Sequence, residues 1–110
     1  MHDTIATQAL IETLMDKNEN AQVRGLATES LALIGREQPQ VISSLISSLK
    51  DEEVEVRFWS LYTLGELGTL EIIPTIEKLK GDDTILPGWW SISKEAHSAI
   101  EQIRSRNLTQ

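Results

Sequence analysis

Side chains that could carry out catalysis are scarce in this sequence. The 110 residues contain two histidines, His2 and His97, and no cysteine. A metal site on a helix often begins with two histidines four residues apart, and neither histidine has such a partner. The absence of cysteine also removes thiolate ligands and thiol nucleophiles. We therefore expect no metal, no cofactor and no enzymatic activity.

Aromatic side chains offer a different kind of chemistry, the anchoring of a partner. The chain has five aromatic residues, and three of them, Phe58, Trp59 and Tyr62, lie within five positions. In a helix Phe58 and Tyr62 would share a face, with Trp59 beside them. Exposed rings of this kind anchor protein interfaces, whereas buried rings would fill space beside small residues of neighbouring helices. The sequence leaves both interpretations open.

The other two aromatic residues, Trp89 and Trp90, follow Pro87-Gly88, a strong turn signal, in the segment ILPGWW. This segment belongs to an insertion at residues 84–90. An apolar insertion can fold back as a lid on a small core. Alternatively, one of the two tryptophans extends the aromatic group of residues 58–62.

The elements that must position these residues are revealed by an internal repeat. Val23-Arg24 recurs 33 residues later as Val56-Arg57, and the spacing of small and apolar residues returns from Ile92. In each copy, apolar or small residues at offsets 0, 4, 8 and 11 form one stripe on a helix. The segment before each stripe also has helical periodicity, as in the run from Ile42 to Leu49.

These patterns predict six helices in three antiparallel pairs, with repeats at approximately residues 5–35, 40–68 and 71–105 of a single all-α domain spanning 1–110. Pro39 and Pro74 suit the first turn of a helix. Asp51, Asp83 and Ser91 are candidate N-caps, because each offers a side-chain oxygen to unpaired backbone N–H groups.

The segments VRGLATESLALIG and VRFWSLYTLGELG, the latter followed by EIIPTIEKLKGDD, are similar to the HEAT-like repeats of the phycobilin-lyase class. The resemblance covers about residues 5–105, and the third copy departs from the pattern at Ser93, Gln102 and Arg104. It implies a short right-handed α-solenoid whose second helices line a concave surface. The arginines of the pattern, Arg24 and Arg57, would then bond acidic turns such as the one containing Asp51.

Carried onto this chain, the resemblance places eight side chains on the partner-binding concave surface. They are Leu26 and Glu29 from the first copy, Phe58, Trp59, Tyr62 and Glu66 from the second, and Lys94 and Glu95 from the third. Trp89 and Trp90 could extend this surface. Glu29, Glu66 and Glu95 would surround the aromatic rings with negative charge.

Composition excludes several classes of partner. The formal charge is −7, from 17 acidic and 10 basic residues, and the basic residues are not clustered, which argues against nucleic acid and anionic membranes. No run of apolar residues is long enough to cross a membrane. The lack of cysteine and of a signal-peptide pattern favours a cytoplasmic protein.

The favoured hypothesis is a non-catalytic scaffold that binds a protein or peptide with apolar and basic groups. The alternative, which the resemblance implies, is an accessory or lyase subunit that binds an open-chain tetrapyrrole of a phycobiliprotein. Weak homodimerisation through the aromatic residues is a further hypothesis.

Overall fold

The computed structural model describes residues 4–36 and 38–108. Their helices, in chain order, are α1 (Thr4–Met15), α2 (Ala21–Ile34), α3 (Pro39–Ser48), α4 (Val54–Leu67), the 3₁₀-helix η1 (Leu70–Ile72), α5 (Ile73–Glu77) and α6 (Ile92–Leu108). The six predicted helices are confirmed, and they pair as α1 with α2, α3 with α4, and α5 with α6.

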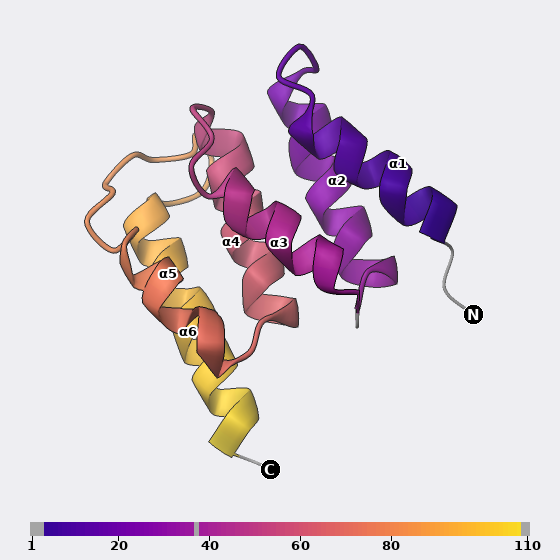
Figure 1. Ribbon diagram of the computed structural model, residues 1–110. Coiled ribbons are helices and arrows are strands. Elements are labelled where there is room, and N and C mark those ends of the chain that lie inside the picture. Colours follow the sequence, from indigo (N-terminus) through magenta and orange to yellow (C-terminus); the bar gives the residue numbers. More distant parts are fainter. Residues whose placement is uncertain (1–3, 37, 109–110) are drawn as a thin grey trace.

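The helices form two layers, with α1, α3 and α5 in one and α2, α4 and α6 in the other (Figure 1). In the second layer α4 lies between α2 and α6 and packs against both. The described residues span 35 × 33 × 21 Å. Each pair buries its apolar stripe against its neighbour, as the stacking of solenoid repeats requires, and the fold is the predicted short α-solenoid.

The core follows the repeat register. Buried positions of the stripes include Leu31 in α2, Val56 and Leu64 in α4, and Ile92 and Ile100 in α6. Val23 is the exception, since 41% of its surface is exposed. The stripe position therefore holds an apolar residue that is not fully covered by the rest of the structure.

Helix starts agree with the predictions only in part. Pro39 and Pro74 lie in the first turns of α3 and α5, and the Ser91 hydroxyl accepts a hydrogen bond from the Lys94 N–H at the start of α6 (3.1 Å). Asp51 and Asp83 are not N-caps. The cap of α4 is Glu53, and no helix of the described residues begins directly after Asp83.

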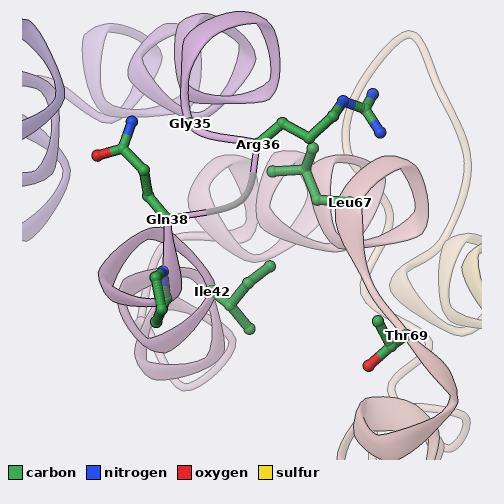
Figure 2. A pocket seen from close by; sticks show the side chains of 7 residues that line it. Gly35, Arg36, Gln38, Ile42, Leu67 and Thr69 are labelled. Carbon is green, nitrogen blue, oxygen red and sulfur yellow. The ribbon is translucent and has the colours of Figure 1, made fainter. Parts of the chain in front are cut away.

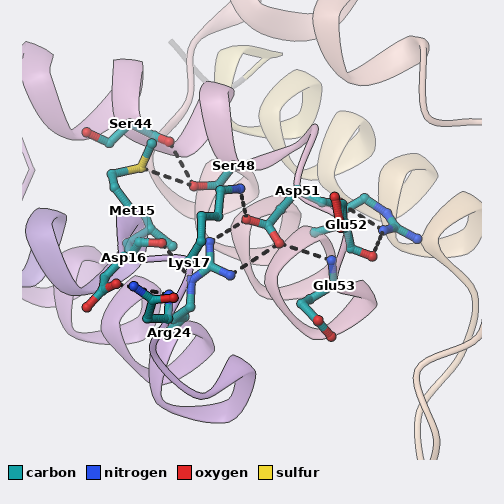
Figure 3. Close-up of polar contacts among 12 residues, drawn as sticks. Met15, Asp16, Lys17, Arg24, Ser44, Ser48, Asp51, Glu52 and Glu53 are labelled. Carbon is teal, nitrogen blue, oxygen red and sulfur yellow. Dashed lines mark hydrogen bonds and ion pairs between the residues drawn. The ribbon is translucent and has the colours of Figure 1, made fainter.

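Asp51 instead joins the first helix pair to the second, through a buried carboxylate (Figure 3). The Arg24 guanidinium donates to both carboxylate oxygens and to the Leu14 carbonyl (2.9 Å). Lys17 Nζ lies 2.6 Å from Oδ2, and the Glu53 N–H donates to Oδ1 (3.0 Å). Burial raises the pKa of Asp51, but the bonds from Arg24 and Lys17 outweigh it and lower the pKa to about 2.

Arg57 joins the second pair to the third in a similar way. Its guanidinium donates to the backbone carbonyls of Asp51 (2.9 Å) and Glu52 (3.0 Å), and its Nε lies 3.2 Å from Oδ2 of Asp82. Asp82 lies in the connection between α5 and α6. The two arginines of the repeat therefore each link one helix pair to an acidic turn of the next.

We expect Asp51→Asn to lower the free energy of unfolding by about 3 kcal/mol at neutral pH, because Arg24 would stay buried without its counter-charge. Urea unfolding followed by far-ultraviolet circular dichroism measures this. Because the pKa of Asp51 is lowered from 3.8 to about 2 on folding, its ionisation stabilises the fold fully above pH 4 by roughly 2 kcal/mol. This contribution is lost as the pH falls towards 2, so the difference between the two proteins should shrink there.

Asp83→Asn is the matched control, since Asp83 is an exposed carboxylate on the α5–α6 connection. Its unfolding free energy should stay within about 0.5 kcal/mol of the wild type. An equal loss in both variants would contradict a special role of the Asp51 ion pair.

Ser60 generates a second stability prediction. Its hydroxyl is buried on α4 without a hydrogen-bond partner among the described residues, at a stripe position that holds alanine in the other two copies. Ser60→Ala should raise the free energy of unfolding by about 1 kcal/mol beyond the gain from helix propensity. Ser98→Ala, at an exposed position of α6, measures the propensity gain alone, and an equal gain in both variants would refute the prediction.

Candidate functional site

The five aromatic rings of the chain lie together at the beginning of α4. Trp59 is the centre, with ring centroids 5.0 Å from Phe58, 5.7 Å from Tyr62 and 5.0 Å from Trp89. Trp90 packs 5.4 Å from Trp89 and 5.8 Å from Phe58. Most of these pairs meet edge to face, the arrangement that aromatic quadrupoles favour. We call these five residues the aromatic cluster.

Phe58 is the inner wall of the aromatic cluster and not part of its surface. Only 1% of it is exposed, because Trp59, Trp89 and Trp90 cover it. The expectation that Phe58 touches a partner directly is therefore wrong. Tyr62 and Trp89 are 40% and 50% exposed, Trp90 is also exposed and Trp59 is half-buried, so four rings reach solvent.

Two local contacts fix Trp59. Its indole N–H donates to Oε2 of Glu55, one helical turn earlier (2.9 Å). Its Cδ1 atom lies against Gly25 on α2, where an added Cβ would come within 2.9 Å. The glycine therefore lets the indole lie flush against α2, and Trp59 bridges the second-layer helices of two neighbouring pairs.

Trp89 and Trp90 are brought to α4 by the connection between α5 and α6, which loops out beside the start of α4 (Figure 1). Within this connection Ile85 and Ser91 form a bridge, and the Leu86 N–H donates to the Trp90 carbonyl (3.1 Å). Gly88 has φ of 87°, which lets the chain turn sharply. Leu86 is buried, so the insertion both covers part of the core and adds two rings to the cluster.

Glu95 lies on the core side of the aromatic cluster and is not part of the negatively charged surface around the rings. Its side chain is 4% exposed and its Oε1 accepts a hydrogen bond from the Trp90 indole N–H (2.7 Å). Burial raises the pKa of Glu95, although the Trp90 bond partly opposes this. The expectation of Glu95 as a surface residue is corrected: the inserted loop lays Trp90 over it.

Lys94, Glu29 and Glu66 surround the cluster at the surface. Lys94 Nζ lies 5.1 Å from the centre of the Trp90 ring, a cation–π contact. Glu66 is half-buried and accepts a bond from the Gln102 side chain (3.3 Å), while Glu29 is exposed. Above all the charge of Glu66, then partial burial and the charges of Glu29 and Glu95, raise the pKa of Tyr62. The electrostatic potential beside this ring is therefore negative.

A cavity of about 240 Å³ opens beside Trp59, between α2 and α4. Its lining residues are Gln22, Leu26, Glu29, Glu55 and Trp59. We call it the α2–α4 cavity. Leu26, one of the expected surface residues, is 60% exposed there. Sequence reasoning missed Gln22 and the role of Glu55, which the four-residue spacing of Glu55 and Trp59 could have indicated.

Another hollow lies at the opposite end of α4, lined by Gly35, Arg36, Gln38, Pro39, Ile42, Leu67 and Thr69 (Figure 2). Its volume is about 250 Å³. The Gln38 amide is turned away from Ile42 and donates to the Thr7 hydroxyl and the Ile34 carbonyl (both 3.1 Å). What remains is a mainly aliphatic hollow, and its described lining residues form no catalytic arrangement.

The described residues offer neither a candidate metal cluster nor a candidate membrane-spanning helix. Residues 4–36 and 38–108 contain no group of three potential metal ligands, and none of their helices is both long and apolar enough to cross a membrane. His97 is exposed on α6, and His2 lies outside the described residues.

Comparison with known proteins agrees with this architecture. A family model of HEAT repeats matches residues 7–85, the region from α1 through α5. The match supports HEAT repeats in general and does not single out the phycobilin-lyase type. No curated protein matches the chain.

Glu95 generates a prediction with a matched pair of variants. Because its pKa is raised on folding, the folded state loses stability as the pH rises from the ordinary carboxyl range through the folded pKa. Glu95→Gln keeps an acceptor for Trp90 without the buried charge, so its thermal unfolding midpoint at neutral pH should exceed that of the wild type. The advantage should shrink as the pH falls towards about 4.

Glu95→Ala should instead lower the midpoint, since the buried Trp90 N–H bond is lost. Thermal unfolding followed by circular dichroism at several pH values separates the two effects. A Glu95→Gln midpoint below that of the wild type at neutral pH would mean that the ionised carboxylate stabilises the fold.

Proposed function

Because this chain belongs to the HEAT-repeat family, whose members commonly serve as protein-interaction scaffolds, we propose that it binds a protein or peptide segment through the aromatic cluster. The observation that carries the proposal is the exposure of four contacting rings on one surface. Contiguous exposed aromatic surface is unusual on a protein that has no partner for it.

The rings are also held in place before any partner arrives. The indole N–H groups of Trp59 and Trp90 are both bound to carboxylates of the same chain, and Phe58 supports three rings from the core side. A rigid anchor loses little conformational entropy on binding, which leaves more of the contact energy for affinity.

Charge supports a partner with basic groups beside its apolar ones. Glu29, Glu55 and Glu66 lie around the cluster, and Lys94 is the basic residue in contact with it among the described side chains. The net charge of −7 opposes nucleic acid and anionic lipid. A basic, apolar segment of a protein is attracted by both features of this surface.

The size of the cavity beside Trp59 favours a peptide side chain over an open-chain tetrapyrrole at that place. The α2–α4 cavity measures about 240 Å³, less than the ~300 Å³ at which small-molecule sites usually begin. An extended or helical peptide needs no enclosed site, because it can lay several side chains across an open surface.

The proposal is tested by selecting binders from a phage-displayed library of random peptides with the full chain as bait. We expect enrichment of peptides that combine apolar and basic residues. A Tyr62→Ala, Trp89→Ala double variant should bind the selected peptides at least about 30-fold more weakly, because aromatic anchors of this kind are often interface hot spots. Isothermal titration calorimetry with synthetic peptides gives the affinities.

Ile5→Ala is the control, since Ile5 is an apolar residue on α1, in the other layer, and is even more exposed than Tyr62 and Trp89. Its affinity for the peptides should equal that of the wild type. Failure to enrich any peptide, or unchanged binding by a folded double variant, would contradict the proposed function. Self-association of the wild type that the double variant abolishes, seen by sedimentation equilibrium, would assign the cluster to a homodimer instead.

A further inference from the structure

We propose that the α2–α4 cavity is a specificity pocket that receives one arginine or lysine side chain of the bound peptide. This inference rests on the proposed function and deepens it, since it says which chemical group of the partner is recognised. It is carried by the joint presence of an aromatic wall, an aliphatic wall and two carboxylates in a single hollow.

The size of the cavity fits one side chain. About 240 Å³ is open between α2 and α4, which is below the range of sites that enclose a whole small molecule. The aromatic cluster lies directly beside it, because Trp59 belongs to both. A peptide whose apolar residues rest on the cluster can therefore place a neighbouring side chain in the cavity.

The walls suit a side chain with a long apolar stem. Leu26 on α2 and the indole of Trp59 on α4 line the cavity, and Leu26 has 60% of its surface available for contact. Lysine and arginine carry three or four methylene groups that pack against such surfaces. A guanidinium or ammonium group near the indole gains a cation–π contact as well.

The carboxylates suit the charged end of that side chain. Glu29 approaches the cavity from α2 and Glu55 from α4, and no lining residue is basic. One oxygen of Glu55 accepts a hydrogen bond from the Trp59 N–H. The other oxygen has no hydrogen-bond partner among the described residues, so it can accept a bond from a ligand. Glu29 also contributes, after Glu66 and partial burial, to the raised pKa of the neighbouring Tyr62, so its charge reaches the aromatic cluster as well.

A metal ion is a poor occupant, because two of the five lining residues offer it no ligand and the described residues hold no group of three potential ligands. A neutral apolar side chain would bury both carboxylates without compensation, at a cost in desolvation. A cation with an apolar stem satisfies every wall at once.

The probe is N-acetyl-arginine methylamide, titrated into the ¹⁵N-labelled full chain and followed by the backbone and indole N–H resonances. Saturable shifts should centre on the Trp59 indole and on the amides of Gly25, Leu26 and Glu29. The citrulline analogue has the same shape without the charge, and it should bind at least about tenfold more weakly. Added salt should weaken arginine binding and leave the citrulline titration unchanged.

The variant that tests the pocket is Glu29→Gln combined with Glu55→Gln. The glutamine at position 55 retains an acceptor for the Trp59 N–H, so the wall stays in place while the charge is removed. Arginine affinity should fall at least about tenfold. The control is Glu12→Gln combined with Glu101→Gln, which makes the same change in net charge at exposed positions of α1 and α6 and should bind as the wild type does.

The outcomes separate this inference from the proposed function. Equal shifts with citrulline, shifts centred elsewhere, or arginine binding that survives in the doubly substituted Glu29/Glu55 variant would each overturn the pocket, whether or not peptides are selected. Arginine binding in the predicted place, with no peptide enriched from the library, would support the pocket and contradict the proposed function.

Discussion

The buried ion pair between Asp51 and Arg24 sets the distance between the first two helix pairs, and the rest of the surface depends on that distance. The carboxylate contacts the turn after α1, the side of α2 and the backbone at the start of α4. Compared with a well-packed apolar pair, a buried ion pair adds little net stability, but it makes alternative registers costly because they would leave Arg24 or Asp51 without its partner. α2 and α4 are thereby held at the separation at which Trp59 can lie against Gly25.

The second-layer helices approach one another so closely that only small side chains fit at the contact positions. Gly25 faces Trp59, and Gly65 lies so near Ala99 on α6 that an added Cβ would come within 3.3 Å of the alanine side chain. Small residues on both flanks of α4 let it contact α2 and α6 at once. α4 is consequently covered on most sides, which explains why Phe58, Thr63 and Ser60 are buried although they do not share one face.

The sequence was sufficient to predict the elements, because a repeat fixes helix boundaries and buried faces several times over. Leu31, Leu64 and Ile100 are buried at equivalent positions, as the shared offsets require. It was insufficient for Phe58 and Glu95, because both are covered by residues 84–90, which have no counterpart in the other copies. Periodicity indicates the direction in which a side chain points from its helix. It does not indicate whether an inserted loop covers that side chain, because this depends on tertiary contacts such as that of Trp90 with Glu95.

The gathering of the aromatic residues also has a spectroscopic consequence. All three tryptophans of the chain, Trp59, Trp89 and Trp90, belong to the aromatic cluster, and their rings lie close enough for their electronic transitions to couple. The intrinsic fluorescence and the near-ultraviolet circular dichroism of this protein therefore originate almost wholly from one surface. The molecule carries a built-in reporter whose signal describes the state of that surface, including the contact of Trp59 with α2.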